Sequence, residues 1–208
     1  MTEPLSDRDE NTRHAEKAKK RKAAHDKKLE GMTGSKGLII VHTGTGKGKT
    51  SAALGMVFRH IGHGMPVGVV HFTKSEKWNT GEAKLLAKFP ELATLHIMGE
   101  GFTWETQDRE RDIAAARAGW ERAKELIRDD RHRMVLLDEL NIVLRYDYLP
   151  IEEIVAVLLD DKPADKHVVI TGRNAHPALV EIADLVTDMT LVKHPFRAGV
   201  KAQKGVEF

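Results

Sequence analysis

The sequence predicts a three-layer α/β fold built on a mainly parallel sheet. From Gly37 onward, short β-branched runs alternate with segments whose apolar residues have helical spacing, the order expected of strands joined by crossover helices. The runs are apolar on both faces, as buried strands with helices on either side should be. The predicted strands cover residues 38–42, 67–72, 94–98, 134–137, 168–171 and 185–191.

Helical spacing marks three segments between these strands. Apolar side chains recur every three or four positions within residues 54–61, 113–127 and 151–159. Pro150 stands immediately before the third segment, where the fixed φ of proline suits the first turn of a helix. We expect these helices to cover the sheet.

The first 36 residues form a basic N-terminal arm, and residues 37–208 form the α/β domain. Between Arg13 and Lys28 there are eight Lys or Arg residues and two acids, although the net charge of the whole chain is only +2. Residues 12–29 have the composition of a helix but no apolar face, so such a helix needs a partner surface. A solvated, disordered tail is the alternative. A nucleic-acid-binding arm is disfavoured, because no aromatic residues are interleaved with the basic ones.

Composition excludes several classes of protein. The 208 residues include no cysteine, which rules out a disulfide framework, a thiolate metal site and a cysteine nucleophile. This fits a reducing compartment, and we predict a cytoplasmic protein. No apolar stretch approaches the roughly 18 to 20 residues that span a bilayer, and the N-terminus is charged, so we expect neither a membrane anchor nor a signal sequence.

The run T-G-T-G-K-G-K-T at 43–50 follows the first strand directly and predicts a phosphate-binding loop. Glycines allow backbone angles that turn successive N–H groups around an anion, Lys49 can reach phosphate oxygens, and the Thr50 hydroxyl can hold Mg²⁺. Thr43 replaces the first glycine of the general pattern. A simple glycine-rich turn would leave the Lys49–Thr50 pair unexplained. The residues expected to bind the nucleotide are Gly44, Thr45, Gly46, Lys47, Gly48, Lys49 and Thr50.

Two acids provide the second half of the predicted nucleotide site. Asp138 and Glu139 follow the apolar strand 134–137, and open α/β sheets bind ligands where their strands end. Either acid could hold Mg²⁺, directly or through water, beside the hydroxyl of Thr50. In a kinase or an ATPase, Glu139 could instead position the attacking group.

A series of motifs resembles one family of nucleotide-binding enzymes. In order, they are T-G-T-G-K-G-K-T (43–50), G-H-G (62–64), V-G-V-V-H-F-T-K (67–74), G-E (81–82), G-F-T-W-E-T-Q (101–107), V-L-L-D-E-L (135–140), Y-D-Y-L-P (146–150), I-T-G-R (170–173) and V-K-H-P-F-R-A-G-V-K-A-Q-K-G (192–205). The set resembles the ATP:corrinoid adenosyltransferases, the P-loop type of cobalamin biosynthesis and salvage. The loop without its first glycine and the 101–107 motif are the most specific parts. Local departures from the family pattern are Thr45, Thr73, Ser75 and Arg197.

The resemblance implies a RecA-like P-loop NTPase fold and a specific reaction. A Co(I) corrinoid attacks the ribose 5′-carbon of ATP, takes the 5′-deoxyadenosyl group and releases triphosphate. Lys49 would stabilise the leaving triphosphate together with Mg²⁺. By the same resemblance, Phe102 and Trp104 flank the lower face of the corrin and exclude its axial ligand. The acceptor can be a complete cobalamin or an incomplete corrinoid.

The resemblance also implies partners. A flavin-type donor would reduce Co(II) to Co(I), and the N-terminal arm would cover the corrinoid site, often that of the other subunit in a homodimer. Lys74 and Arg173 would contact phosphates or the rim of the corrinoid, with surface ion pairing as the alternative for each. Two rival functions remain: a P-loop ATPase or small-molecule kinase, and a nucleotide-dependent nucleic-acid-binding module.

Overall fold

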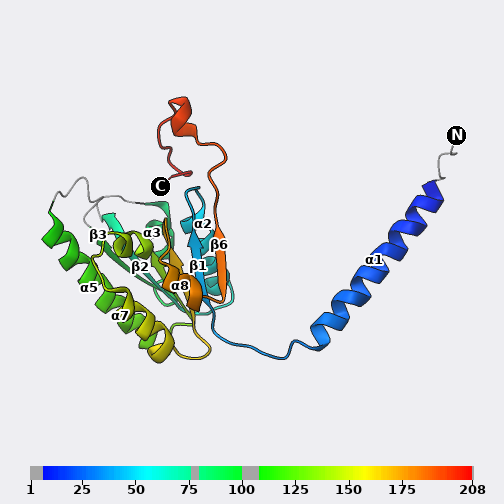
Figure 1. Ribbon diagram of the computed structural model, residues 1–208, viewed down its shortest axis with the longest axis horizontal. Coiled ribbons are helices and arrows are strands. Elements are labelled where there is room, and N and C mark those ends of the chain that lie inside the picture. The colour runs from blue at the N-terminus through cyan, green and yellow to red at the C-terminus, as the bar shows by residue number, and fades with distance from the viewer. Residues whose placement is uncertain (1–6, 76–79, 100–107, 208) are drawn as a thin grey trace. The chain divides into compact units, whose positions relative to one another are not determined.

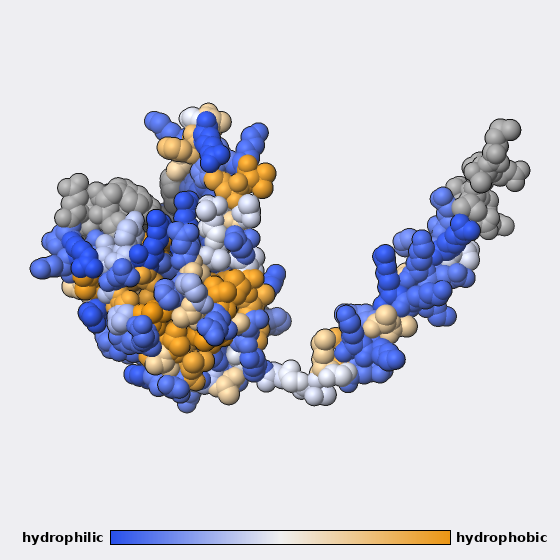
Figure 2. Space-filling view, viewed as in Figure 1, coloured by the Kyte–Doolittle hydropathy of each residue, from blue (hydrophilic) through white to orange (hydrophobic). Residues whose placement is uncertain are grey.

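The computed structural model describes residues 7–75, 80–99 and 108–207. Contacts within the chain divide it into two compact units, Met1–Ser35 and Lys36–Phe208. Among its described residues the first unit has one helix, α1 (Asp7–Glu30), which includes the whole segment expected to be helical. Its side chains from Glu10 onward are exposed, and the face of the helix seen in Figure 2 is mostly hydrophilic. The helix therefore has no apolar face of its own.

The second unit is built on a six-stranded sheet of order β3-β2-β4-β5-β1-β6 (Figure 1). Each pairing between these strands is parallel. All the predicted strands are present, so the predicted fold class is confirmed. The strands are β1 (Ile39–Thr43), β2 (Val67–Ser75), β3 (Ala93–Gly99), β4 (Met134–Asp138), β5 (His167–Thr171) and β6 (Leu185–Asp188).

The last strand is shorter than the predicted 185–191. It ends at Asp188 because the backbone of Met189 turns toward the glycine-rich loop. The Met189 amide donates to the Thr43 carbonyl at 2.9 Å, and its own carbonyl accepts from the Gly46 amide at 2.6 Å. Met189 therefore still bonds to the last residue of β1, but its carbonyl is taken by the glycine-rich loop.

The three predicted helices are present. They are α2 (Lys49–Gly62), α5 (Arg109–Arg128) and α7 (Ile151–Ala156), which continues as the π-helical turn η2 (Val157–Asp161). Short helices add to them, and these have too few residues for an apolar periodicity to be visible in the sequence. They are α3 (Gly81–Leu86), α6 (Leu140–Arg145), α8 (Pro177–Ile182) and the 3₁₀ turn η3 (Pro195–Ala198). None of the described helices combines the length and the apolar character needed to cross a membrane.

Side chains of the inner strands enter two separate cores, one on each face of the sheet, which makes the three predicted layers. One core lies between the sheet and α2 and α3, and it includes Ile40, Val69 and Leu136 from the strands. The other lies between the sheet and α5, α6, α7 and α8, and it includes Val41 and Val70. Both faces of the parallel sheet are therefore covered, which accounts for strands that read as apolar on both sides.

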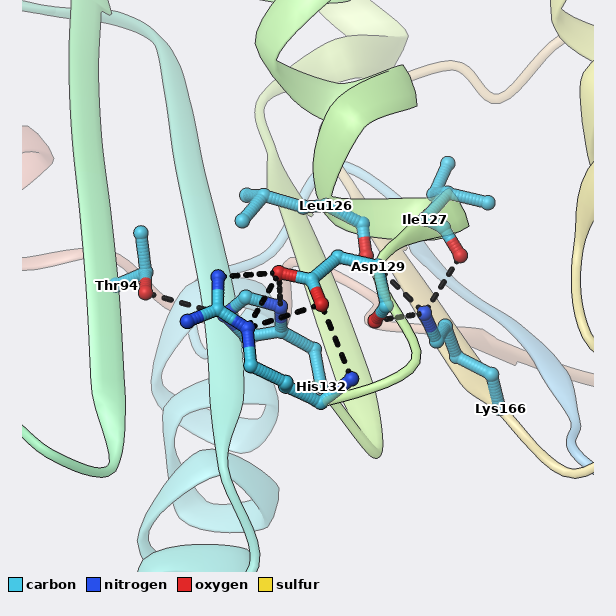
Figure 3. A network of polar contacts seen from close by, with 7 residues as sticks. Thr94, Leu126, Ile127, Asp129, His132 and Lys166 are labelled. Carbon is cyan, nitrogen blue, oxygen red and sulfur yellow. Dashed lines mark hydrogen bonds and ion pairs between the residues drawn. The ribbon is translucent and has the colours of Figure 1, made fainter.

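All six strands begin at one end of the sheet and end at the other, where the glycine-rich loop lies. We call the end at which the strands begin the opposite edge. A buried lysine, Lys166, caps the C-terminal end of α5 at this edge. Lys166 is 2 % exposed and lies nearly forty residues after the end of α5 in the sequence. Its ammonium donates to the carbonyls of Leu126, Ile127 and Asp129 at 3.1, 2.6 and 2.7 Å (Figure 3). These are the carbonyls that a helix end leaves without partners, so Lys166 acts as the cap of α5.

A buried histidine extends the same network. His132 lies just before β4, and its Nε2 is 3.1 Å from the hydroxyl oxygen of Thr94 at the start of β3 (Figure 3). Its Nδ1 is 3.3 Å from a carboxylate oxygen of Asp129. Every member of this network contacts another part of the fold, so its evident role is structural.

Candidate functional site

A row of polar side chains lies where four neighbouring strands end, and we call this border the site edge. His42 of β1 pairs in register with Thr171 of β5, and His71 of β2 pairs with Asp138 of β4. The Thr171 hydroxyl donates to Asp138 Oδ1 at 2.7 Å and so joins the two pairs across adjacent strands. All four residues are buried. An otherwise apolar sheet therefore presents a continuous polar row at the end that carries the glycine-rich loop.

The glycine-rich loop requires its glycines for two different reasons. Gly44 and Gly48 have φ angles of 98° and 106°, which disfavour any residue with a Cβ atom. A Cβ atom on Gly46 would lie 2.7 Å from the Met189 carbonyl oxygen and 2.8 Å from that of Thr190. Gly48 is also the N-cap of α2, whose first N–H groups have no partner within the helix and can bind an anion. The loop has the geometry of a phosphate cradle.

Lys49 folds back over this loop. Its side chain is 6 % exposed, and its ammonium donates to the carbonyls of Gly44 at 2.9 Å and Gly46 at 2.5 Å. Burial lowers the pKa of Lys49, and the negative charge of Glu139 opposes this effect. The ammonium therefore lies within the electrostatic reach of both the loop and the acids after β4.

Asp138 is fully buried and held by three donors. His71 Nδ1 lies 2.8 Å from Oδ2, Lys74 Nζ lies 3.2 Å from the same oxygen, and Thr171 donates to Oδ1. Burial alone would raise the pKa of Asp138, but these donors and the charge of Lys74 hold it well below its usual range. Asp138 is thus a fixed, ionised carboxylate within the sheet.

Glu139, the next residue, has a contrasting environment. Its backbone is left-handed, with φ 64°, and its amide donates to the Thr171 hydroxyl at 2.9 Å. Among the described residues, none donates a hydrogen bond to its carboxylate. Burial and the neighbouring charge of Asp138 raise the pKa of Glu139 to about 7, with Lys49 opposing. A strained backbone that presents a carboxylate without a partner is typical of a ligand site.

Lys74 and Arg173 lie near these acids in different ways. Lys74 is 19 % exposed and bridges Asp138 and Glu82, with its Nζ 2.8 Å from a Glu82 oxygen. Burial lowers the pKa of Lys74, but the charges of Asp138 and Glu82 outweigh it and the net pKa is raised. Arg173 is exposed after β5, and its charge acts on both Lys49 and Glu139.

The C-terminal segment returns to the loop. Glu207 forms an ion pair with Lys47, and the Glu207 side chain is only 18 % exposed. The segment that follows β6 therefore contacts the glycine-rich loop at both of its ends, first through Met189 and then through Glu207.

Comparison with known proteins decides the family. A model of the family ATP:corrinoid adenosyltransferase BtuR/CobO/CobP matches residues 35–208. The chain belongs to this family. A corrinoid adenosyltransferase of Sinorhizobium sp. is 58% identical over 200 residues, which cover 96% of this chain and 93% of the relative. Those of Pseudomonas aeruginosa and Escherichia coli K12 are 52% and 45% identical, over 94% of this chain and 96% and 98% of their own lengths. The expected family resemblance is confirmed.

The oxygen atoms available in this adenosyltransferase suit Mg²⁺ bound together with a nucleotide. Thr50, the second residue of α2, is half-buried, and Asp138 and Glu139 provide carboxylates. Magnesium prefers oxygen ligands and commonly uses one or two carboxylates together with phosphates and waters. Within the described ranges, no group of three His, Cys, Asp or Glu residues could hold a metal ion alone. Such a donor set fits a cation that arrives with a triphosphate.

Sequence reasoning reached only part of this site. The loop, Lys49, Asp138 and Glu139 were expected, whereas Phe102 and Trp104 lie outside the described residues. His71 and Thr171 were missed as partners of Asp138, and Glu207 was missed as a partner of Lys47. The sequence contains one signal for His71 and Thr171, because several apolar runs end in a polar residue and the ends of parallel strands lie at the same edge of a sheet. Those endings are I-I-V-H (39–42), G-V-V-H (68–71), V-L-L-D (135–138) and V-V-I-T (168–171).

Proposed function

We propose that this enzyme transfers the 5′-deoxyadenosyl group of ATP to the cobalt of a Co(I) corrinoid and releases triphosphate. The observation that supports it most is the presence of the phosphate cradle and the Asp138–Glu139 pair at one edge of the sheet, in a chain of the adenosyltransferase family. A kinase or an ATPase is not favoured, because the family matches over nearly the whole α/β domain.

The bonds that change define what the protein has to stabilise. A cobalt–carbon bond forms with the electron pair of Co(I), the bond between the 5′-carbon and its oxygen breaks, and the electron pair of that bond leaves with the triphosphate. Negative charge therefore grows on the leaving oxygen. The amides at the start of α2 and the ammonium of Lys49 would stabilise it. To do so, Lys49 would exchange the carbonyls of Gly44 and Gly46 for phosphate oxygens.

We assign different roles to the two acids. Glu139 would contact Mg²⁺ together with Thr50, since no described residue donates a hydrogen bond to its carboxylate. Asp138 already accepts from three donors, so it would act on the metal through water. Bound Mg²⁺ would neutralise charge on the triphosphate.

The remaining side chains complete the proposal. Lys74 would keep Asp138 ionised rather than bind phosphate directly, and exposed Arg173 would contact phosphates or the corrinoid rim. Phe102 and Trp104 would flank the lower face of the corrin, as the family resemblance implies. A flavin-type electron donor and a cytoplasmic setting belong to the same proposal.

Product analysis tests this function. Incubation with ATP, Mg²⁺ and a chemically reduced corrinoid under anaerobic conditions should give a light-sensitive cobalt–carbon product and one triphosphate per transfer. Release of ADP or orthophosphate without an organometallic product would support a kinase or an ATPase instead. Comparing the rates for a complete cobalamin and an incomplete corrinoid would identify the preferred acceptor.

The arm provides a second test. We propose that α1 covers a corrinoid site, in a homodimer that of the other subunit, since the helix has no apolar face with which to pack. Removal of residues 1–36 should weaken corrinoid binding and leave ATP binding unchanged. Circular dichroism would establish that the shortened chain is folded, and an unchanged corrinoid affinity would contradict the role of the arm.

A further inference from the structure

We infer that His71 is a positioning residue of the nucleotide site, which orients the Asp138 carboxylate for the metal that accompanies ATP. The inference rests on the proposed Mg²⁺ site and extends it to a side chain that lies on a different strand. His71 would act only through Asp138 and would not touch the substrate.

Burial indicates that the bond between these two side chains is specific. His71 is 1 % exposed and Asp138 is fully buried, and His71 Nδ1 lies 2.8 Å from Asp138 Oδ2. An ionised carboxylate can only accept, so Nδ1 is the donor. The other ring nitrogen, Nε2, is buried without a hydrogen-bond partner among the described residues. Within the described part of the chain, the bond to Asp138 is thus the one hydrogen bond of this buried ring.

The sheet itself fixes the direction of that bond. His71 and Asp138 are partners in the register of β2 and β4, so the imidazole approaches the carboxylate from one neighbouring strand. Thr171 approaches from the other neighbouring strand, β5, and binds the second oxygen. With both oxygens held from opposite sides, the carboxylate cannot rotate freely. Groups that fix a metal-associated carboxylate in this way typically account for 10- to 100-fold of metal affinity or activity.

Lys74 does not make His71 redundant. Its ammonium reaches the same oxygen, Asp138 Oδ2, from within the stretch of β2 between His71 and Ser75 where the pairing with β3 is irregular. However, Lys74 is also bound to Glu82, so its position depends on α3 as well as on the sheet. Lys74 provides charge, and His71 provides the contact that is aligned with the strand register.

The opposite edge supplies a matched control for the experiment. His132 is 5 % exposed, also sits beside β4, and also lies close to an aspartate and a threonine, but at the far end of the strands (Figure 3). We would prepare full-length His71→Ala, His71→Gln and His132→Ala. The readouts are the Mg²⁺ concentration for half-maximal binding of a fluorescent, non-hydrolysable ATP analogue, its affinity without Mg²⁺, and the thermal midpoint of unfolding.

We expect His71→Ala to raise the half-saturating Mg²⁺ concentration by about 10- to 100-fold, with little change in binding without the metal. His71→Gln should recover most of the loss, because its amide can donate to the same carboxylate oxygen. His132→Ala should lower the thermal midpoint and leave the Mg²⁺ requirement as it is in the unchanged protein.

Several outcomes would overturn the inference. They are an unchanged Mg²⁺ requirement in both His71 variants, or an equal loss of affinity with and without Mg²⁺, which would indicate general damage. If His71→Ala fails to fold, Thr171→Val removes the other donor to Asp138 and should raise the Mg²⁺ requirement in the same direction. Because the assay contains no corrinoid, failure of adenosyl transfer would leave this result interpretable. Nucleotide binding that is independent of Mg²⁺ in the unchanged protein would overturn the metal site and this inference together.

Discussion

The two edges of the sheet carry similar polar residues and use them differently. Each edge brings together a histidine, an aspartate and a lysine that are largely buried. They are His71, Asp138 and Lys74 at the site edge, and His132, Asp129 and Lys166 at the opposite edge. At the opposite edge the lysine meets backbone carbonyls that the end of α5 would otherwise leave unsatisfied. At the site edge the polar groups surround Glu139, to which no described residue donates and whose backbone is left-handed.

The polar groups at the opposite edge stabilise the native state, whereas Glu139 at the site edge destabilises it. A helix end that is capped internally lowers the free energy of the native state. A half-buried carboxylate such as that of Glu139, which accepts no hydrogen bond from the described residues, raises it, and such groups persist where a ligand provides the missing partner. Substitutions at the opposite edge should therefore reduce stability alone, whereas substitutions at the site edge should reduce activity, with a loss of stability as well where the residue replaced is Asp138 or Lys49.

The sharpest test of this contrast is Lys49→Ala. Loss of the ammonium beside the leaving triphosphate should lower the rate of triphosphate release by about 10²- to 10³-fold. The free energy of unfolding should fall by about 1–3 kcal/mol, because the buried carbonyl of Gly46 loses its donor; the rate is therefore measured on the folded protein. Single-turnover release of triphosphate measures the effect. Lys88→Ala, an exposed lysine after α3, is the control. Equal rates of triphosphate release in Lys49→Ala and Lys88→Ala would show that Lys49 does not stabilise the leaving triphosphate.

Lys166→Met tests the opposite edge. The methionine preserves most of the side-chain volume but leaves three carbonyls at the end of α5 without a donor. We expect the free energy of unfolding to fall by about 3 kcal/mol, measured by urea denaturation. The rate of triphosphate release from the folded fraction should stay the same. A large loss of activity in Lys166→Met without a loss of stability would show that the opposite edge also contributes to activity.

Glu139→Gln tests the strained acid through pH. A folded pKa of about 7, against an ordinary 4.5, means that the folded state binds this proton more tightly than the unfolded state does. The associated stability is complete below pH 4.5 and is lost as the pH rises through 7, a difference of no more than about 3 kcal/mol. Without Mg²⁺, the glutamine variant should therefore unfold at higher urea concentration than the unchanged protein at pH 8, but not at pH 4.5.

The same variant should lose Mg²⁺-dependent nucleotide binding if Glu139 contacts the metal. Asp138→Asn should behave differently, since it replaces a carboxylate that three donors stabilise and should destabilise the fold. Equal changes in stability at both pH values in Glu139→Gln would show that Glu139 is not strained by its ionisation.

Glu207→Gln should have the smallest effect. The ion pair with Lys47 is partly exposed, and such pairs contribute about 0–1 kcal/mol. We expect the affinity for ATP to change by less than about fivefold at low salt and by still less at high salt, as isothermal titration would measure. A larger effect that salt does not reduce would mean that the C-terminal segment contributes more to the loop than this one charge.

Much of the fold could be predicted because its signals are local. The apolar run 38–42 followed by glycines and Lys49 describes one strand, one loop and one helix that are contiguous in the chain. The short helix α6 could not be predicted in the same way, because its six residues are too few to show a period. The end of β6 was misjudged for a related reason, since Met189 leaves the strand to bond with a loop that lies far away in sequence.

The amino-acid sequence by itself determined the strands, the phosphate loop and the two acids, since each depends on residues within a few positions of one another. Only the tertiary structure decided that His71 and Thr171 hold Asp138, that Lys74 shares it, and that Glu139 is left without such donors. Sheet register brings together residues that lie 67 and 33 positions apart in the chain. That register depends on pairing between strands that lie far apart in the chain and on the helices that cover both faces of the sheet, so no local pattern specifies it.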